Sequence, residues 1–307
     1  MTTMGKSISV ALATYNGELF LKMQLDSILQ QSISIDEIVI VDDASMDGTV
    51  EIIKEYQITN PLIKLIKNPS NFGPTKSFEI AVNNCHGDLI VLSDQDDIWY
   101  KNKVAVLVSN IGNAKLIHHD ASLIDDKGNK IGESLLEFID YYPIESFFVR
   151  LMREGVHGCC LMMTKEVAFA ARDIPAGFIY HDFFYNLVAC SLGDIKTINL
   201  PLMSYRLHGN NACGLFAEKS YTRAMKDYSK NLNNMRLIVD LPIFNQYKSD
   251  IQFYIDYYSK FIYQQSSSIY FMSRVAKLLG LKKALGLFIN NMFGKAGVKF
   301  FYDRISK

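Results

Sequence analysis

The 307-residue sequence lacks any uncharged apolar run of about 18 residues, so no transmembrane helix is expected. Its first residues, MTTMGKSISVALATYN, also lack the basic region, long apolar run and small-residue cleavage site of a secretory signal. Neither sign of charge is in excess, because 32 Lys and Arg residues balance 32 Asp and Glu residues. We therefore expect a cytoplasmic protein that does not bind nucleic acid through its overall charge.

Two common phosphate-binding motifs are absent as well. No GxGxxG sequence follows the first predicted strand, and the chain has no P-loop. A Rossmann dinucleotide site and a P-loop nucleotide site are therefore disfavoured, and any nucleotide must be held by other groups.

Cysteine is scarce and forms no recognisable framework. The number of cysteines is odd, and no two of them have CxxC spacing: they are Cys85, Cys159, Cys160, Cys190 and Cys213. This pattern indicates reduced, mostly buried thiols of a cytosolic protein, not disulfides and not a zinc site.

The sequence does contain a regular alternation of strand and helix patterns over its first hundred residues. Continuous apolar runs rich in β-branched residues predict buried strands at 7–15, 37–43, 63–68 and 87–94. Apolar residues at helical spacing predict helices at 18–31 and 45–57, and Pro74 is placed to open a third that reaches about Cys85. Strands that alternate with helices indicate an α/β fold with a mostly parallel central sheet flanked by helices.

The alternation becomes irregular beyond residue 113. The stretch AKLIHHDASLIDDKGNK predicts a strand followed by a polar hairpin or turn at 125–128. Further along, we expect a strand that passes into a helix over 155–171, a helix over 179–193, and a strand over 198–211. The rest of the chain is predicted to be helical. We therefore expect one domain over 1–212 and a helical C-terminal extension over 213–307.

Polar clusters follow the first, second and fourth predicted strands: ATYNGE, VDDAS and SDQDD. Ligands of open parallel sheets bind at the carboxyl ends of the strands. Asp94, Asp96 and Asp97 would repel one another if left uncompensated, and Mg²⁺ or Mn²⁺ takes carboxylate and phosphate oxygens as ligands. The clusters thus predict a site for a divalent cation and a diphosphate. A purely structural acidic network is the alternative.

Four longer stretches contain these clusters: VALATYNGELFLKMQLDSILQQS, EIVIVDDASMDGT, NPSNFGPTKSFEIAV and GDLIVLSDQDDIW. Together with YHDFF and YRLHGNN, they resemble the family-2 glycosyltransferases of the GT-A fold, close to a bacterial rhamnosyltransferase-like branch. The resemblance covers about residues 7 to 212. It implies the GT-A nucleotide-diphospho-sugar transferase fold and a metal-dependent, inverting glycosyltransferase that uses Mg²⁺ or Mn²⁺. The implied substrates are a nucleoside-diphosphate sugar, with rhamnose from dTDP-rhamnose as the expected donor, and a cell-surface glycan or lipid-linked acceptor.

The resemblance also implies roles for residues at matching positions. The nucleotide and donor would contact Thr14, Tyr15, Asn16, Glu18, Asp42, Asp43, Asp94, Asp97 and Arg206. Asp94 would serve the ribose side, whereas Asp97 would be an outer acid or a contact to the donor sugar. The metal and diphosphate would be held by Asp96 and His208. His157 and the Cys159–Cys160 pair border the acceptor site in such proteins, and we assign them no chemistry.

Asp182 in YHDFF matches the catalytic base of the resembled family. Transfer of a sugar requires a group that takes the proton of the acceptor hydroxyl, and a carboxylate at the start of a helix can do this. One base and direct displacement predict inversion at the anomeric carbon. The alternative is that Asp182 only caps its helix, because Asp is a favoured capping residue.

The C-terminal segment 271–307 is rich in Lys and Arg, which alternate with large apolar residues around the single acid Asp303. A basic amphipathic helix pair of this kind can lie on an anionic membrane surface, which would place the protein peripherally on the inner face of the cell membrane. The alternative is a helical cap whose basic face is solvated.

Two other functions are compatible with acids at strand ends. A nucleotidyltransferase also holds metal and nucleotide there, but no glycine-rich basic phosphate loop follows the first strand. A non-catalytic glycan- or sugar-nucleotide-binding component of an assembly complex would not need Asp182. The products separate these alternatives: nucleoside diphosphate for a glycosyltransferase, pyrophosphate for a nucleotidyltransferase, and none for a binding component.

Overall fold

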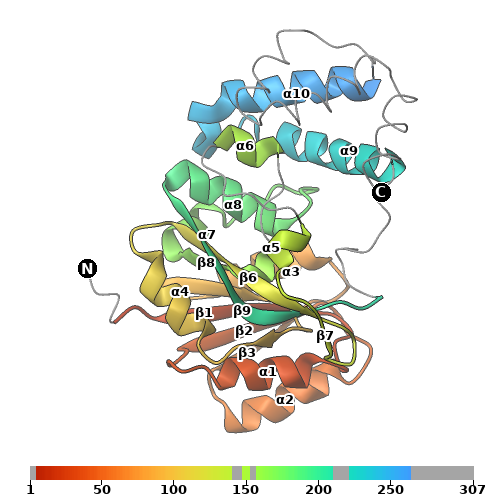
Figure 1. Ribbon diagram of the computed structural model, residues 1–307. Helices are drawn as coiled ribbons and strands as arrows, with labels where there is room; N and C mark the ends of the chain where they lie inside the picture. Colours follow the sequence, from red (N-terminus) through yellow and green to blue (C-terminus); the bar gives the residue numbers. More distant parts are fainter. Residues whose placement is uncertain (1–4, 140–146, 153–156, 210–220, 264–307) are drawn as a thin grey trace. The chain divides into compact units, whose positions relative to one another are not determined.

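The computed structural model describes residues 5–139, 147–152, 157–209 and 221–263 (Figure 1). The chain divides into two compact units, which are considered separately. The first comprises Met1–Ile144, Glu154–Ile174 and Tyr180–Cys213, and the second Glu145–Arg153, Pro175–Ile179 and Gly214–Lys307. The domain boundary expected at residue 212 stays a prediction, because 210–220 lie outside the described residues.

The first unit is built on one nine-stranded sheet with the order β3-β2-β1-β4-β8-β6-β9-β5, in which β7 pairs with β6. Its strands are β1 (Ile8–Thr14), β2 (Glu37–Asp42), β3 (Ile63–Lys67), β4 (Leu89–Ser93), β5 (Ile98–Trp99), β6 (Leu116–Ile124), β7 (Lys130–Gly132), β8 (Leu161–Thr164) and β9 (Ile195–Arg206). All residues of β2, β4 and β6 are buried, so these strands form the centre of the core.

The four strands β3, β2, β1 and β4 pair in parallel, as the alternation of patterns predicts. Thr14 at the end of β1 lies opposite Asp42 at the end of β2, and Leu12 lies opposite Ser93 at the end of β4. The loops after these three strands therefore leave the sheet at the same edge, which brings the three polar clusters together.

The sheet becomes mixed beyond β4. Strand β8 pairs antiparallel with both β4 and β6, β9 runs parallel to β6, and β5 pairs antiparallel with β9. The predicted parallel pairing thus holds for β1, β2, β3 and β4, whose connections are helical, and the rest of the sheet is mixed. Strand β5 was not predicted, because two residues are too few to show a period.

Helices cover both faces of this sheet (Figure 1). Helices α1 and α2 pack together on one face, whereas α3, α7 and α8 pack together on the other. Their bounds, with those of the remaining elements of this unit, are α1 (Leu21–Leu29), α2 (Thr49–Thr59), α3 (Pro74–Asn83), α4 (Lys103–Ile111), α5 (Leu135–Phe138), the 3₁₀ helix η1 (Gly158–Cys160), α7 (Lys165–Ala170) and α8 (His181–Leu192). Pro74 is the first residue of α3, where its fixed φ and missing N–H are tolerated.

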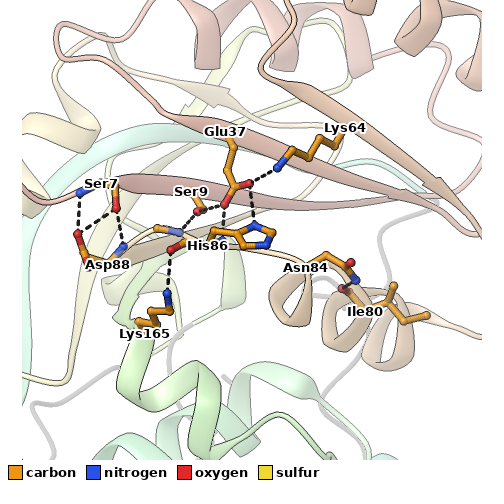
Figure 2. Close-up of polar contacts among 10 residues, drawn as sticks. Ser7, Ser9, Glu37, Lys64, Ile80, Asn84, His86, Asp88 and Lys165 are labelled. Carbon is orange, nitrogen blue, oxygen red and sulfur yellow. Dashed lines mark hydrogen bonds and ion pairs between the residues drawn. The ribbon is translucent and has the colours of Figure 1, made fainter.

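The opposite edge of the parallel strands is held by a polar network around Glu37 (Figure 2). The carboxylate of Glu37 accepts hydrogen bonds from Ser9 Oγ at 2.6 Å, Lys64 Nζ at 2.7 Å and the backbone N–H of His86. These bonds tie β1, β2, β3 and the turn before β4. This network lies away from the three polar clusters and stabilises the sheet.

The second unit is helical in its described part. It contains α6 (Phe147–Met152), α9 (Tyr221–Ile238), the 3₁₀ helix η2 (Pro242–Tyr247) and α10 (Lys248–Tyr263). Phe147 stacks on Tyr247 with ring centroids 3.9 Å apart, so α6 packs on η2. Among the described helices, none combines the length and apolar character needed to cross a membrane. The basic segment 271–307 lies outside the described residues.

Candidate active site

The loop after β1 is joined to the loop after β4 by Gln95, a residue that the sequence did not single out. Gln95 Oε1 accepts hydrogen bonds from Thr14 Oγ1 at 2.6 Å and from the N–H of Tyr15 at 2.8 Å. Its Nε2 donates to the carbonyl of Tyr15 at 3.1 Å. A Cβ at Gly17 would lie 2.4 Å from Gln95 Oε1, so a larger residue there would displace the Gln95 side chain from this junction. Two of the three polar clusters therefore form one surface.

The loop after β2 joins the same surface through Asn16 and Glu18. Asn16 has a φ of 47°, and its Oδ1 accepts a hydrogen bond from the N–H of Met46 at 2.9 Å. Glu18 Oε2 accepts one from the N–H of Gly48 at 2.7 Å. Both side chains thus order the loop between β2 and α2. Tyr15, with 40% of its surface exposed, faces solvent at this rim.

The two acids after β2 differ in how many partners they have. Asp43 Oδ1 accepts hydrogen bonds from Asn68 Nδ2 at 2.7 Å and Phe72 N–H at 2.8 Å, and its Oδ2 accepts one from Gly73 N–H at 2.8 Å. Asp42 Oδ2 accepts one from Ser45 N–H at 3.1 Å, whereas its buried Oδ1 has no partner among the described residues. Asp43 orders the loop before α3, and Asp42 keeps a free acceptor.

The three acids after β4 are crowded and largely withdrawn from water. Burial, together with repulsion from Asp96, raises the pKa of Asp94 to about 7. The same two causes raise the pKa of Asp97 well above its usual range. Asp97 is fully buried, and its Oδ1 accepts a hydrogen bond from the N–H of Arg206 at 3.1 Å. The cluster predicted from SDQDD is therefore a real concentration of carboxyl groups, and two of them resist ionisation unless a positive charge lies beside them.

Two buried cations lie beside these acids. Arg206 is 1% exposed, and its guanidinium donates to the carbonyls of Asp96, Asp125 and Asp126 at 2.8 to 3.2 Å. Lys103, the first residue of α4, is fully buried and donates to the carbonyl of Cys159 at 2.7 Å. Burial lowers the pKa of Lys103 to about 8, although Asp97 and Asp94 favour its charged form. These cations offset part of the charge of the acids.

Asp96 and His208 come together as the predicted metal pair. His208 Nε2 lies 2.8 Å from Asp96 Oδ2, and both side chains are only slightly exposed. Adjacent ligands of one octahedral cation with bonds of about 2.1 Å stand about 3 Å apart. The spacing of this nitrogen and oxygen therefore fits two ligands of the same ion.

Asp182 lies in the first turn of α8, after Tyr180, whose φ of 74° is rare for a residue with a side chain. Asp182 Oδ2 accepts a hydrogen bond from the N–H of Gly158 at 3.1 Å, and its Oδ1 accepts one from the N–H of Phe183 at 2.8 Å. The second bond comes from an N–H in the first turn of the helix, so a capping contribution is present. The N-cap position itself belongs to Tyr180.

The segment His157–Cys160 connects this carboxylate to the acids after β4. Gly158 N–H binds Asp182, the sulfur of Cys159 lies within 4.8 Å of a carboxylate oxygen of Asp94, and the carbonyl of Cys159 accepts from Lys103. No chemistry was expected of Cys159, and Gly158 was not singled out, because their partners lie far away in the chain. Lys103 could have been noticed, because it shares a helical face with the buried Leu107 and Ile111.

The comparisons with known proteins agree with this geometry. The family model described as "Glycosyl transferase family 2" matches residues 9–169. A dTDP-rhamnosyl transferase, RfbG, from Shigella flexneri is 29% identical over 222 residues, which span 66% of this chain and 73% of that protein. An uncharacterized glycosyltransferase from Methanocaldococcus jannaschii is 32% identical over 207 residues, which span 65% of this chain and 70% of that protein.

Solved structures share the fold at lower identity. S. aureus TarS 1–349 in complex with UDP-GlcNAc matches with a TM-score of 0.59 and 18% identity, covering 93% of this chain and 81% of that one. The mannosyltransferase PcManGT from Pyrobaculum calidifontis, in complex with GDP-Man and Mn²⁺, matches with a TM-score of 0.52 and 16% identity, covering 98% and 86%. The GT-A fold expected from the sequence is thereby confirmed.

Proposed function

The chain belongs to glycosyl transferase family 2 and is a glycosyltransferase, and from this premise we propose that it is a metal-dependent, inverting enzyme that moves rhamnose from dTDP-rhamnose onto a cell-surface glycan or a lipid-linked acceptor. A sugar nucleotide as donor is supported by the family. The sugar, the metal, the acceptor and the roles of individual residues are the content of the proposal.

One observation carries this proposal: the segment His157–Cys160 is hydrogen-bonded to Asp182 and holds the Cys159 sulfur within 4.8 Å of a carboxylate oxygen of Asp94. A base for the acceptor and acids for the donor therefore border one site, as direct transfer between two bound substrates requires. A binding protein has no need of a carboxylate held beside the donor acids. A nucleotidyltransferase would need cationic groups that reach the phosphates, whereas Arg206 and Lys103 are buried and bonded to carbonyls.

The residues present fit a divalent cation. Asp96 and His208 are spaced like adjacent ligands, and the neighbouring acids supply the negative charge that a cation neutralises. When bound with the donor, Mg²⁺ or Mn²⁺ would neutralise the charge that develops on the diphosphate leaving group. The complex of PcManGT with GDP-Man and Mn²⁺ supports this assignment by analogy of fold.

The chain's own residues would perform the remaining work. Asp182 would take the proton of the acceptor hydroxyl as that oxygen attacks the anomeric carbon, and displacement from the opposite face would invert its configuration. Gly158 N–H and Phe183 N–H would keep the carboxylate pointed at the acceptor.

The nucleoside would lie on the surface formed by the joined loops after β1, β2 and β4. Thr14, Tyr15 and Asn16 would line its pocket, and Glu18 would act by holding the loop after β2. The free Oδ1 of Asp42 would accept a hydrogen bond from the base or ribose, with Asp43 ordering the adjacent loop. Asp94 would bind the ribose, and Asp97 would support Asp94. Arg206 would keep Asp96 and Asp97 in position through its hydrogen bonds to the Asp96 carbonyl and the Asp97 carboxylate.

The donor and the reaction class are tested together. Purified full-length protein would be screened against a panel of nucleotide sugars by thermal shift, with and without Mn²⁺, and then mixed with donor and candidate acceptors. Stabilisation by dTDP-rhamnose that requires Mn²⁺, and release of nucleoside diphosphate, are expected. Release of pyrophosphate would identify a nucleotidyltransferase, and binding without any release would identify a binding component.

We also propose that the basic segment 271–307 associates with an anionic membrane surface where a lipid-linked acceptor resides. The support is the alternation of Lys and Arg with large apolar residues in its sequence. Co-sedimentation with vesicles that contain anionic lipid would be compared for the wild type and for the variant Lys282→Glu with Lys283→Glu. Weaker sedimentation of the variant is expected, and equal sedimentation would favour a solvated helical cap.

A further inference from the structure

A second group of side chains with the chemistry of metal ligands includes two of the acids that follow β4. One ligand atom each from Asp94, Asp97 and Cys159 can be chosen so that all three atoms lie within 4.8 Å of one another. These residues come from the loop after β4 and from η1, which are far apart in the chain, and η1 packs against β4. The group of Asp94, Asp97 and Cys159 shares no residue with the pair Asp96 and His208, and unlike that pair it includes a sulfur atom.

The group contains an unsatisfied polar atom. Asp97 is fully buried, and its Oδ1 is occupied by the N–H of Arg206. Its Oδ2 is also buried and has no hydrogen-bond partner among the described residues. An unpaired carboxylate oxygen in a dry environment is costly unless a proton or a cation satisfies it. This atom can therefore accept a proton or a cation, and a carboxylate oxygen of the same residue lies within 4.8 Å of the Cys159 sulfur.

The charges around the group suit a divalent ion. With a metal bound, two carboxylates and a thiolate would carry three negative charges, and the ammonium of Lys103, which is bonded to the Cys159 carbonyl, would supply one positive charge against them. The remaining excess of two is what one divalent cation neutralises. Lys103 also lies 3.9 Å from the centre of the Trp99 ring.

We infer that Asp94, Asp97 and Cys159 form a binding site for a thiophilic divalent cation of the Zn²⁺ and Cd²⁺ class. Two oxygens and one sulfur suit such borderline or soft ions, whereas Mg²⁺ avoids sulfur. Binding forms a metal–sulfur bond and releases the thiol proton of Cys159 to the solvent. The ion would enter past Asp94, which is only partly buried, because Cys159 and Asp97 are fully covered.

This site has a consequence for the transferase, and that consequence rests on the proposed function. Asp94 is assigned to the ribose of the donor, so a cation that engages its carboxylate competes with donor binding. Zn²⁺ or Cd²⁺ is therefore expected to inhibit transfer, whereas Mn²⁺ at Asp96 and His208 supports it. The same acidic cluster would thus distinguish between hard and thiophilic metals.

The test titrates metal-free, full-length protein with Cd²⁺ and follows the ultraviolet absorption of the Cd²⁺–thiolate bond. Cys159→Ser is compared with Cys160→Ser, which changes the neighbouring, equally buried cysteine outside the cluster. We expect the wild type and Cys160→Ser to show the absorption. Cys159→Ser should lose it and bind Cd²⁺ at least about tenfold more weakly. Asp97→Asn, which keeps the volume, should weaken Cd²⁺ binding with the thiol intact.

Each result decides between the alternatives. Equal Cd²⁺ absorption and affinity in the wild type and Cys159→Ser would overturn the inference, as would equal losses in Cys159→Ser and Cys160→Ser. Asp96→Asn separates the two sites, because it should keep the Cd²⁺–thiolate absorption and lose Mn²⁺-dependent nucleotide binding. If the wild type shows the Cd²⁺ signal but no Mn²⁺-dependent nucleotide binding, the proposed metal dependence fails and the thiophilic site stands.

Discussion

His208 Nε2 lies 2.8 Å from Asp96 Oδ2, although 112 positions separate the two residues in the chain. His208 follows β9 and Asp96 follows β4, and the sheet brings the two loops together. The same region holds the buried guanidinium of Arg206, which lies 4.7 Å from the ring of Phe20. The pair is thus supported by packed groups and not by a mobile surface contact.

Replacement of His208 tests the metal pair. His208→Gln removes the imidazole and leaves Asp96 in place, so we expect the affinity for nucleotide in the presence of Mn²⁺ to fall by about tenfold or more. Binding without metal should change little. Isothermal titration of dTDP with and without Mn²⁺ measures both quantities. His86→Gln is the matched control, because that exposed imidazole lies at the opposite edge of the sheet. Equal losses with and without Mn²⁺ would contradict a metal role.

Asp182→Asn separates chemistry from binding. The amide has nearly the same size and can still accept the N–H of Gly158, but it cannot take a proton. If Asp182 is the base, donor affinity stays near that of the wild type while the rate of transfer falls by about a hundredfold or more. Single-turnover transfer and donor titration on the same variant measure the two effects. A near-normal rate would leave Asp182 only its contribution to the helix terminus, because Asn caps about as well as Asp.

Gly158→Ala tests the contact that orients this base. A Cβ at position 158 would lie 2.9 Å from His181 Nε2 and 3.4 Å from Asp182 Cβ, so His181 or η1 must shift, and Gly158 and Asp182 belong to these two segments. We expect kcat to fall by about tenfold or more, because small misplacements of a catalytic group are costly. Mn²⁺-dependent nucleotide binding on the same sample should remain and serves as the internal control. Unchanged kcat would show that the position of Asp182 does not depend on Gly158.

The parallel part of the sheet and the three polar clusters were predictable from the sequence because both depend on local pattern. Buried strands read as continuous apolar runs, and topology places their carboxyl ends at one edge. The partners of the site were not predictable. Gln95 bonds to Thr14 across 81 positions, and Lys103 bonds to the carbonyl of Cys159 across 56. Such pairs are set by tertiary packing and leave no periodic signal.

The spacing of cysteines in the sequence likewise did not predict which residues a thiol contacts in the folded protein. The absence of CxxC argues against a zinc site whose ligands are neighbours in sequence. It says nothing about one thiol brought to two acids from another loop, which is the arrangement of Cys159 with Asp94 and Asp97. The prediction of mostly buried thiols agrees with Cys159 and Cys160, which are fully buried, whereas Cys85 and Cys190 are partly exposed.

Glu37 links the stability of the sheet to pH. Burial acts to raise the pKa of its carboxyl, but hydrogen bonds from Lys64, Ser9 and His86 outweigh burial and hold this pKa at about 2. The unfolded value is about 4.3, so the folded pKa is the lower one. The stabilisation is therefore fully present above about pH 4.3 and is lost as the pH falls toward 2.

Glu37→Gln removes the charged carboxylate and with it this pH-dependent stabilisation. We expect the substitution to lower the free energy of unfolding by about 1 to 2 kcal/mol at neutral pH, since solvent around the exposed Lys64 screens part of the interaction. The difference between wild type and variant should shrink steadily in urea unfolding at successively lower pH. Glu166→Gln, which removes an exposed partner of Lys115, should cost much less at every pH. A Glu37→Gln penalty that is the same at neutral pH and near pH 3 would show that the carboxylate charge does not contribute.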